Sequence, residues 1–429
     1  MQLLRRNALC ITVLALLLMQ GYAWAAKPIV VRLWNSDTYR NEGLRPLVEE
    51  FNATHIDIRI ELEEKSGEAN SLIPAVVGGA GPNVIVGAST WDRDYYDQGI
   101  LADLRGYVLR DRFSLAEYFP STLEFGSLPS GELFSLPLDS QIIVMYYNPQ
   151  VLGAAGLVQP SQGWSNADFL AMTGKLRRRE SDGTITQHAV VGRHPNHVGM
   201  YFMGQNRSYV VDLSRGVEST VRTPGFRAAY ALIGDLIGED RLRIQGVHSG
   251  VDMSLFTNGK AGFYMDGNFR LLDLTEAMDG VSAAPLLVPS SGESPGAYLW
   301  TRTLALVKSG DDKTDEAAWQ VIKYLSSADA LARYAVGARL LPVARSSIAH
   351  PKFREYVRSY GASIDMMANV YLPAGSGLTE MAAPRAGDIR GPWGSLQTRF
   401  MRGEIPLSTF IEELATQVER VVQEVTARE

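Results

Sequence analysis

The segment LFTNGKAGFYMDGNF, residues 255–269, combines a turn, a short strand and a second turn that leads into a helix. Its Asn-Gly pair at 258–259 tolerates positive φ and predicts the first turn. The small, aromatic and apolar side chains of 261–265 suit a short buried strand. Asn268 interrupts that strand and suits the N-cap of the following helix. Phe269 is therefore expected just beyond the carboxyl end of a strand, where α/β proteins bind ligands.

Strand and helix patterns alternate along the chain before this segment. In order, we expect a strand at 29–34, a helix at 44–55, a strand at 56–63, a helix at 69–81 and a strand at 82–88. The polar residues 35–43 are expected to form a loop. Alternating strands and helices with short connections predict a parallel sheet.

The pattern changes around 142–147, a β-branched and aromatic run that follows Pro137. We expect this run to be a strand that crosses from one lobe of the protein to another. A second α/β region continues to about Pro295. After it we expect a strand at 301–310 and amphipathic helices at 315–327, 328–336 and 408–425. A chain of 429 residues is consistent with two or three domains.

The N-terminus has the features of a secretory signal peptide. Two arginines precede an apolar run at 8–19, and a small-x-small pattern ends at Ala25. We expect cleavage after Ala25 or Ala26, so that 1–25 is the signal peptide and the mature protein is periplasmic. A membrane anchor is the alternative, but the apolar run is too short to span a bilayer. Cys10, the only cysteine, would be removed, which excludes disulfides, and most of the apolar run follows it, which argues against lipidation.

The composition is that of a globular protein, with 46% hydrophobic and 21% charged residues. The formal net charge of −6 argues against nucleic acid or an acidic membrane surface as the main partner. Since no second long apolar run is present, we expect the exported chain to be soluble.

Seven short segments carry further information in their order. They are LRPLVEEFN (44–52), GPNVIV (81–86), GILADL (99–104), LPLDSQIIVMYYN (136–148), GWSNADFLAM (163–172), FTNGKAGFYMDGNF (256–269) and AVGARLLPVARSSI (335–348). In this order they resemble motifs of the periplasmic solute-binding proteins of ABC importers. The resemblance is to extracellular solute-binding protein family 1, the large sugar-binding family that includes maltodextrin-binding protein. It covers nearly the whole mature chain.

This resemblance implies an α/β, two-lobed periplasmic binding protein fold (type II-like), each lobe a mostly parallel sheet flanked by helices. One lobe would comprise 27–138 plus 297–340, and the other 139–296 plus 341–429. The ligand would lie in the interlobe cleft and be enclosed as the lobes close. Where Phe269 stands, the family usually has a tryptophan that stacks on a sugar. Phenylalanine keeps the aromatic face but loses the indole N–H, which argues against a long maltodextrin but not against a sugar.

The ends of the first and third strands supply the first candidate ligand-binding residues. The candidates are Trp34, Asn35, Ser36, Asp37, Ser89, Thr90, Trp91 and Asp92. Rings can stack on a sugar, and the amide, hydroxyl and carboxylate groups can pair with its hydroxyls. The alternatives are that Trp34 belongs to the core and that Asp92 belongs to a capped helix start.

Further candidates come from both crossing strands, a loop, the opening segment and a C-terminal helix. They are Asp139, Gln141, His194, Asn196, Asn268, Phe269, Trp300, Arg390 and Trp393. A hinge cap is the alternative for Asp139 and Gln141, an ordinary surface loop for His194, and a buried strand for Trp300. The four rings expected to line one cleft are Trp34, Trp91, Phe269 and Trp393.

The function implied by the resemblance is capture of a sugar in the periplasm and its delivery to the membrane permease of an ABC transporter. A polyol or glycerophosphodiester ligand is the alternative, for which a phosphate could be bound by Arg93, Arg302, Arg385 and Arg390. A glycosidase is less favoured, although two suitably spaced carboxylates are not excluded by sequence. No hydrolase elbow, phosphate loop or zinc motif occurs, so we expect no cofactor and no metal. We also expect a monomer.

Overall fold

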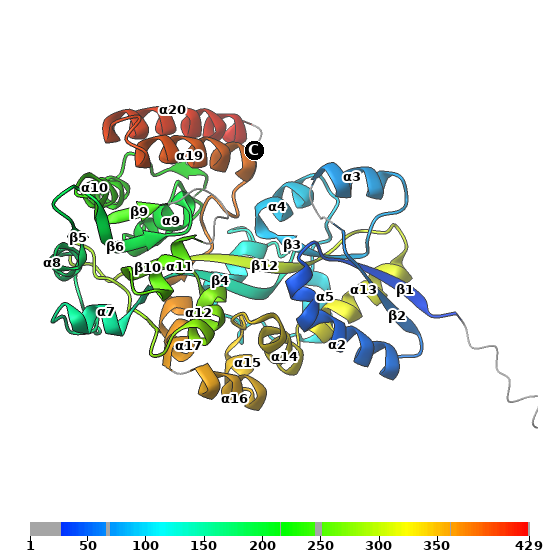
Figure 1. Cartoon of the computed structure of the whole chain (residues 1–429). Coiled ribbons are helices and arrows are strands. Elements are labelled where there is room, and N and C mark those ends of the chain that lie inside the picture. The colour runs from blue at the N-terminus through cyan, green and yellow to red at the C-terminus, as the bar shows by residue number, and fades with distance from the viewer. Residues whose placement is uncertain (1–26, 66–68, 215, 245–250, 361, 428–429) are drawn as a thin grey trace, which may run out of the picture.

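The computed structural model describes residues 27–65, 69–214, 216–244, 251–360 and 362–427. The signal peptide expected at 1–25 lies outside these residues. No helix in the described part of the chain is long and apolar enough to cross a membrane. The chain folds into two α/β lobes, which lie on either side of a shared central pair of strands (Figure 1).

The first lobe is built on a parallel sheet, as the alternating patterns predict. Strand β1 (Ile29–Trp34) pairs in parallel with β2 (Ile58–Glu63) on one side and with β3 (Val84–Ala88) on the other. The helices around this sheet are α2 (Thr38–Thr54), α3 (Ala69–Val77), α4 (Ser89–Asp97), α5 (Arg105–Asp111), α13 (Asp312–Leu325) and α14 (Ala328–Ala338).

The two faces of this sheet pack on different helices because side chains alternate along a strand. Leu33 and Val84 belong to a core cluster with residues of α2, α13 and α14. Their neighbours Trp34 and Ile85 belong to a second cluster with residues of α3 and α4. Figure 1 shows α3 and α4 on one side of the sheet and α2 on the other. Burial on both faces is consistent with the mostly apolar sequences of β1 and β3.

Helix α2 begins at Thr38 rather than at residue 44. The prediction of a loop at 35–43 is therefore wrong for residues 38–43, which are helical. Two polar side chains of its first turns, those of Arg40 and Asn41, are buried and paired. Arg40 is fully buried, and Asn41 Oδ1 accepts a 2.7 Å hydrogen bond from Asn35. Because these two buried residues are polar, a search for a hydrophobic pattern does not detect the start of the helix.

Two long antiparallel strands, β4 (Leu136–Tyr147) and β12 (Ala297–Leu306), join the lobes. One sheet runs through both lobes in the order β2-β1-β3-β12-β4, followed by β10 (Ala261–Gly267), β6 (Ile185–Gly192) and β5 (Arg178–Arg179). All 12 residues of β4 are buried. The prediction that the apolar run at 142–147 crosses between lobes is confirmed.

The second lobe repeats the parallel arrangement, because β6 pairs in parallel with both β10 and β9 (Leu242–Ile244). The shorter strands are β7 (Val211–Asp212), β8 (Glu218–Ser219), β11 (Ser282–Ala283) and β13 (Gly375–Ser376). The remaining helices are α6 (Pro120–Leu123), α7 (Pro149–Ala154), α8 (Asn166–Leu176), α9 (Pro195–Gln205), α10 (Pro224–Gly238), α11 (Val251–Thr257), α12 (Leu271–Ala277), α15 (Arg345–Ala349), α16 (Pro351–Tyr360), α17 (Ala362–Met366), α18 (Leu372–Ala374), α19 (Ala386–Met401) and α20 (Leu407–Thr426). Short 3₁₀ or π turns are η1 (Glu124–Gly126), η2 (Asn268–Arg270) and η3 (Met367–Tyr371).

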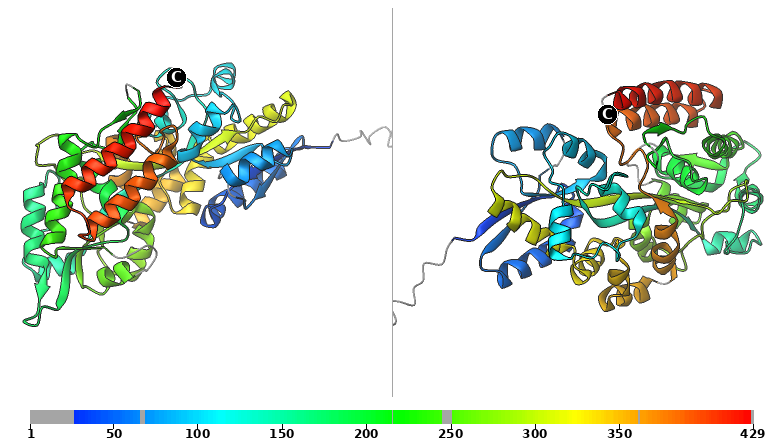
Figure 2. Two further views of the ribbon diagram at one scale, coloured as in Figure 1. Left: turned by 90° about the horizontal axis from the view of Figure 1, so that it is seen from above. Right: turned by 180° about the vertical axis from the view of Figure 1, so that it is seen from behind.

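Helices α19 and α20 lie side by side over the second lobe (Figures 1 and 2). Helix α20 buries Phe410, Leu414 and Val418 along one face, which confirms the amphipathic helix expected at 408–425. Trp393 of α19 and these three side chains of α20 belong to one core cluster. The C-terminal pair therefore completes the core of this lobe.

A buried ion pair fixes the start of β4 to α2. Arg40 Nε lies 2.9 Å from Asp139 Oδ2, and neither side chain is exposed to solvent. Tyr334 of α14 donates a 2.7 Å hydrogen bond to the same carboxylate oxygen. Arg40 also pairs with the partly exposed Asp37, so removing Asp139 takes away the fully buried carboxylate that Arg40 contacts, and removing Arg40 leaves the Asp139 charge uncompensated in the interior.

We expect Asp139→Asn to lower the free energy of unfolding of the ligand-free protein by about 3–5 kcal/mol, because Arg40 loses its buried carboxylate. The control is Asp365→Asn, which removes the exposed ion pair with Arg354 and is expected to cost at most about 1 kcal/mol. Denaturant titration of both variants measures the difference. Equal losses would contradict a special role for the buried pair.

Candidate functional site

The opening segment forms the predicted turn and strand, but Asn268 is not the N-cap of a helix. Gly259 adopts φ +71° in the turn, and β10 ends at Gly267. Residue 267 also occupies the cap position of the short turn η2, where no side chain caps the backbone. Asn268 Oδ1 instead accepts a 2.9 Å hydrogen bond from the backbone N–H of Ile142. Asn268 thus ties the end of β10 to the crossing strand β4.

The ring of Phe269 turns back over the preceding strand end. A Cβ on Gly267 would stand 2.0 Å from Cε1 of this ring, so only glycine leaves room for it. The guanidinium carbons of Arg193 and Arg270 lie 5.7 Å and 5.6 Å from the ring centroid. The ring also packs against the core cluster of the first lobe, although it follows a strand of the second. Phe269 therefore lies where the two lobes meet.

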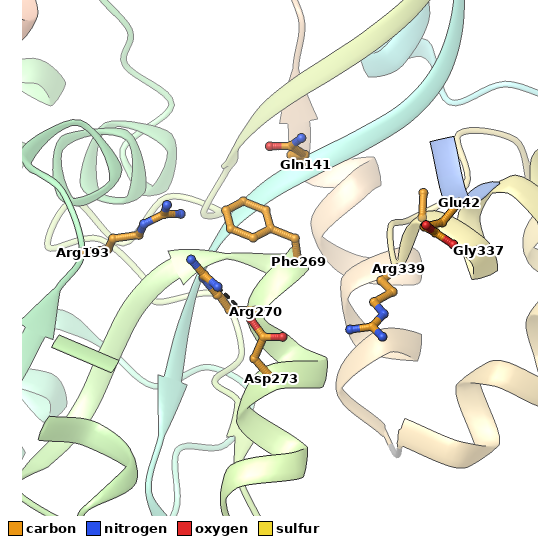
Figure 3. A pocket seen from close by; sticks show the side chains of 9 residues that line it. Glu42, Gln141, Arg193, Phe269, Arg270, Asp273, Gly337 and Arg339 are labelled. Atoms are coloured by element: carbon orange, nitrogen blue, oxygen red, sulfur yellow. Dashed lines mark hydrogen bonds and ion pairs between the residues drawn. The ribbon is translucent and has the colours of Figure 1, made fainter. Parts of the chain in front are cut away.

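A cavity of about 590 Å³ opens beside this ring (Figure 3). It is lined by Glu42, Gln141, Arg193, Phe269, Arg270, Asp273, Gly337, Ala338 and Arg339. The lining comes from α2, α12, α14, β4 and the residues that follow β6 and β10. Its size is typical of a site for a small molecule.

A buried carboxylate holds two of the cavity arginines. Asp266 has no solvent exposure and lies 3.5 Å from Arg193 Nη1 and 3.3 Å from Arg270 Nε. It also lies 2.9 Å from His197 Nδ1 and accepts a 2.7 Å hydrogen bond from Tyr264. Burial alone would raise the pKa of Asp266, but these partners hold it below its ordinary value. The two guanidinium groups are thus fixed beside Phe269.

A second group of side chains lies next to the cavity. It consists of Trp300 and Arg302 on β12 and Arg390 on α19. Trp300 stands directly opposite Gln141 in the β4–β12 pairing. The guanidinium carbon of Arg302 lies 5.3 Å from the Trp300 ring, and that of Arg390 lies 6.0 Å from it. Since opposite residues of an antiparallel pair share a face of the sheet, this group and the cavity lie on one face.

Residues of the first lobe contact these two arginines. Asp37 Oδ2 lies 2.9 Å from Arg302 Nη2, and Thr90 Oγ1 lies 3.4 Å from Arg390 Nη1. Arg390 belongs to α19 of the second lobe. The structure therefore brings together six predicted site residues, namely Asp37, Thr90, Gln141, Phe269, Trp300 and Arg390, beside the interlobe cavity or the polar group next to it.

Three predicted stacking rings do not line the cavity. Trp393 has no solvent exposure, and its Nε1 donates a 2.6 Å hydrogen bond to Tyr230, so it is a core residue. Trp34 is 4% exposed and donates from Nε1 to Glu63 at 3.1 Å. Trp91 is half-buried against the same cluster as Trp34. Aromatic residues beside turns can face the core as well as the cleft, which a sequence pattern does not distinguish.

Several predicted polar contacts are occupied by the protein itself. Asp139 is held by its ion pair, and Asn35 bonds Asn41. Asp92 is buried, accepts a hydrogen bond from Thr303, and has a pKa raised to about 7 by desolvation. These side chains have partners within the protein, and their contact with a ligand stays a prediction.

Two candidates at the start of α9 also have partners within the protein. His194 caps this helix, since its Nδ1 accepts a 3.0 Å hydrogen bond from the backbone of Asn196. Asn196 Oδ1 accepts a 2.6 Å hydrogen bond from Gln397. No group of three or more potential metal-binding His, Cys, Asp or Glu side chains occurs among the described residues. Ser36 is exposed and Ser89 begins α4, and their contact with a ligand stays a prediction.

Sequence reasoning missed most of the cavity lining. Arg193 and Arg270 stand next to segments that it singled out, and Arg339 lies within a matched motif. Arg339 adopts φ +59° at the end of α14, a conformation that is uncommon for residues other than glycine. The proximity of these residues depends on tertiary folding, and no local pattern indicates it.

Residues 35–332 match the family described as bacterial extracellular solute-binding protein. A binding protein of Brucella abortus is 24% identical over 279 residues, which cover 63% of this chain and 65% of that protein. The chain thus spans 65% of the length of the curated relatives it matches first.

Two solved structures share the fold. One is the cyclic α-maltosyl-1,6-maltose binding protein of Arthrobacter globiformis, with a TM-score of 0.76, 17% identity and coverage of 92% of this chain and 100% of that one. The other is UgpB of Mycobacterium tuberculosis in complex with glycerophosphocholine, with a TM-score of 0.75, 16% identity and coverage of 94% and 100%. The two-lobed fold expected from the sequence is confirmed.

The pair Phe269→Ala and Trp393→Ala separates a cavity ring from a core ring. We expect Phe269→Ala to weaken binding of the tightest compound from a panel of sugars, polyols and their phosphates by roughly 1–3 kcal/mol. Trp393→Ala should lower ligand-free stability by roughly 3–5 kcal/mol, and more than Phe269→Ala does. Calorimetric titration and ligand-free unfolding measure the two effects. Normal binding with lost stability in Phe269→Ala would show that its ring belongs to the core.

Proposed function

The chain belongs to the bacterial extracellular solute-binding protein family, and we propose that it captures a sugar or sugar-like small molecule between its lobes and delivers it to the permease of an ABC importer. In this proposal the lobes comprise 27–138 plus 297–340 and 139–296 plus 341–429. The protein works in the periplasm, as a monomer, after loss of its signal peptide.

The cavity around Phe269 is the observation that carries this proposal. Its walls come from both lobes, and it lies beside the strands β4 and β12 that connect them. A solute bound there would contact both lobes, so lobe closure would bury it. Closure on the solute would shift the population toward a form that a permease recognises.

The cavity offers the groups that a polyhydroxylated solute needs. The Phe269 ring can cover the apolar face of a sugar, and the Gln141 amide can donate to and accept from hydroxyls. The carboxylates of Glu42 and Asp273 add acceptors. The names of the structural neighbours fit this class, since one binds a cyclic glucoside and the other is a complex with a glycerophosphodiester.

A catalytic role is the weaker candidate. Two acids, Glu42 and Asp273, line the cavity, so a pair of carboxylates is present. The family and the structural neighbours, however, are named as binding proteins. Incubation with an oligosaccharide that binds, followed by product analysis, is expected to recover the compound unchanged.

A ligand panel tests the proposed function directly. A compound present at about 100 times its dissociation constant should add roughly 2.7 kcal/mol to stability and raise the melting temperature. The panel contains sugars, oligosaccharides, polyols and their phosphates. Stabilisation should be smaller in Gln141→Ala, which removes a cavity amide. If no compound moved the melting temperature, the proposed function would be wrong.

Mass spectrometry of protein exported from cells tests the localisation. The mature chain is expected to lack 1–25 or 1–26, because small residues precede both cleavage points. A mass that retains Cys10, with or without a lipid, would contradict a cleavable signal peptide.

A further inference from the structure

Three buried N–H donors around Trp300 lack acceptors. Trp300 Nε1, Arg302 Nε and Arg390 Nε have no hydrogen-bond partner among the described residues. A buried donor without an acceptor destabilises the folded protein, because the loss of its hydrogen bonds to water is not offset. Native proteins rarely leave several such donors in one place, so their grouping indicates an acceptor supplied from outside the chain.

The three donors belong to one corner of the cleft, which we define as Trp300, Arg302 and Arg390. Both guanidinium carbons lie within 6.0 Å of the centroid of the same indole ring. Arg302 is 13% exposed, so a group from outside can reach a side chain that is otherwise buried. Arg390 comes from α19, whereas the other two residues lie on β12.

The charges at this corner do not balance. Asp37 pairs with Arg302 but also with Arg40, whose second partner is Asp139. No ion pair to Arg390 exists in the described part of the chain. Asp37 and Asp139 thus pair with Arg40 and Arg302, and neither of them pairs with Arg390.

The other acids that act on these arginines are buried. Desolvation raises the pKa of Asp92 to about 7, and it also raises the pKa of Glu380. Each accepts a hydrogen bond from a hydroxyl group, that of Thr303 for Asp92 and that of Tyr298 for Glu380. Among the described residues, neither carboxylate forms an ion pair with Arg302 or Arg390.

The corner adjoins the proposed solute cavity. Trp300 stands opposite Gln141, and Gln141 lines the cavity together with Phe269. Opposite residues of an antiparallel pair have Cα atoms about 4.5–5.5 Å apart. One small molecule can therefore lie against Phe269 and extend to the corner.

We propose that the solute carries an oxyanion, a phosphate or a carboxylate, and that the corner formed by Trp300, Arg302 and Arg390 binds it. This inference rests on the proposed function and names the substrate class, an anionic sugar or polyol. The planar fork of a guanidinium group can donate two parallel hydrogen bonds to a carboxylate or to a phosphate, and charge-assisted hydrogen bonds are the stronger kind. Neutral hydroxyls would accept from the three donors but would leave the excess positive charge.

Matched neutral and anionic compounds test the inference by calorimetric titration. Glycerol is compared with glycerol 3-phosphate, and glucose with glucose 6-phosphate and glucuronate. The anionic member of at least one pair should bind at least about tenfold more tightly, and added salt should narrow the difference. Comparing the phosphates with glucuronate shows whether the corner prefers a phosphate or a carboxylate.

Arg390→Gln should weaken the anionic compound about 10–100-fold and leave its neutral partner within about twofold. Arg390→Lys keeps the positive charge but lacks the planar guanidinium donors. Its affinity for the anionic compound should therefore lie between those of the wild type and Arg390→Gln. The control is Arg399→Gln on the same helix, an exposed arginine paired with Glu413, which should bind like the wild type. Ligand-free melting of each variant verifies that it is folded.

Inorganic phosphate provides a probe that needs no knowledge of the solute. It should raise the melting temperature of the wild type and of Arg399→Gln more than that of Arg390→Gln. Equal stabilisation of all three, or neutral compounds that bind as tightly as anionic ones, would overturn the inference while leaving the proposed function intact. If no compound in the panel binds, the proposed function itself fails and the inference falls with it.

Discussion

The buried pair of Arg40 and Asp139 is the interaction on which the arrangement of the cleft depends. It joins the first turns of α2 to the beginning of β4, the strand that leads from one lobe to the other. Tyr334 adds α14 to the same carboxylate. Through Arg40 the network continues to Asp37 and from there to Arg302 on the second crossing strand. The two crossing strands β4 and β12 are thus anchored by one set of charges that are costly to separate.

A second constraint acts at the end of β10, where Gly267 lets the Phe269 ring turn back over the strand. Asn268 fixes this turn to β4 through the backbone of Ile142. The ring therefore reaches the core of the first lobe from a strand of the second. A ligand against this ring would contact a residue whose position depends on both lobes.

The regular elements were predictable because their patterns are local. The apolar run at 142–147 and the amphipathic residues at 408–425 form the expected strand and helix. Prediction failed where polar or aromatic residues serve the interior. Arg40 is buried at the start of α2, where carboxylates pair with it. Trp393 is buried in the core, where its indole N–H donates a hydrogen bond to Tyr230. Residue type predicts that such groups have partners but not whether the partner is the protein or a ligand.

The arginines of the cleft are held rather than free to turn away, and this bears on how the lobes would close. Asp266 fixes Arg193 and Arg270, and Asp37 fixes Arg302. Closing an empty cleft would bring fixed positive charges into a less polar space, which costs free energy. An anionic solute would offset that cost on binding, whereas a neutral one would leave it in place. In such an arrangement the charge that selects the solute also favours closure, so recognition and the signal to a permease would depend on the same contacts.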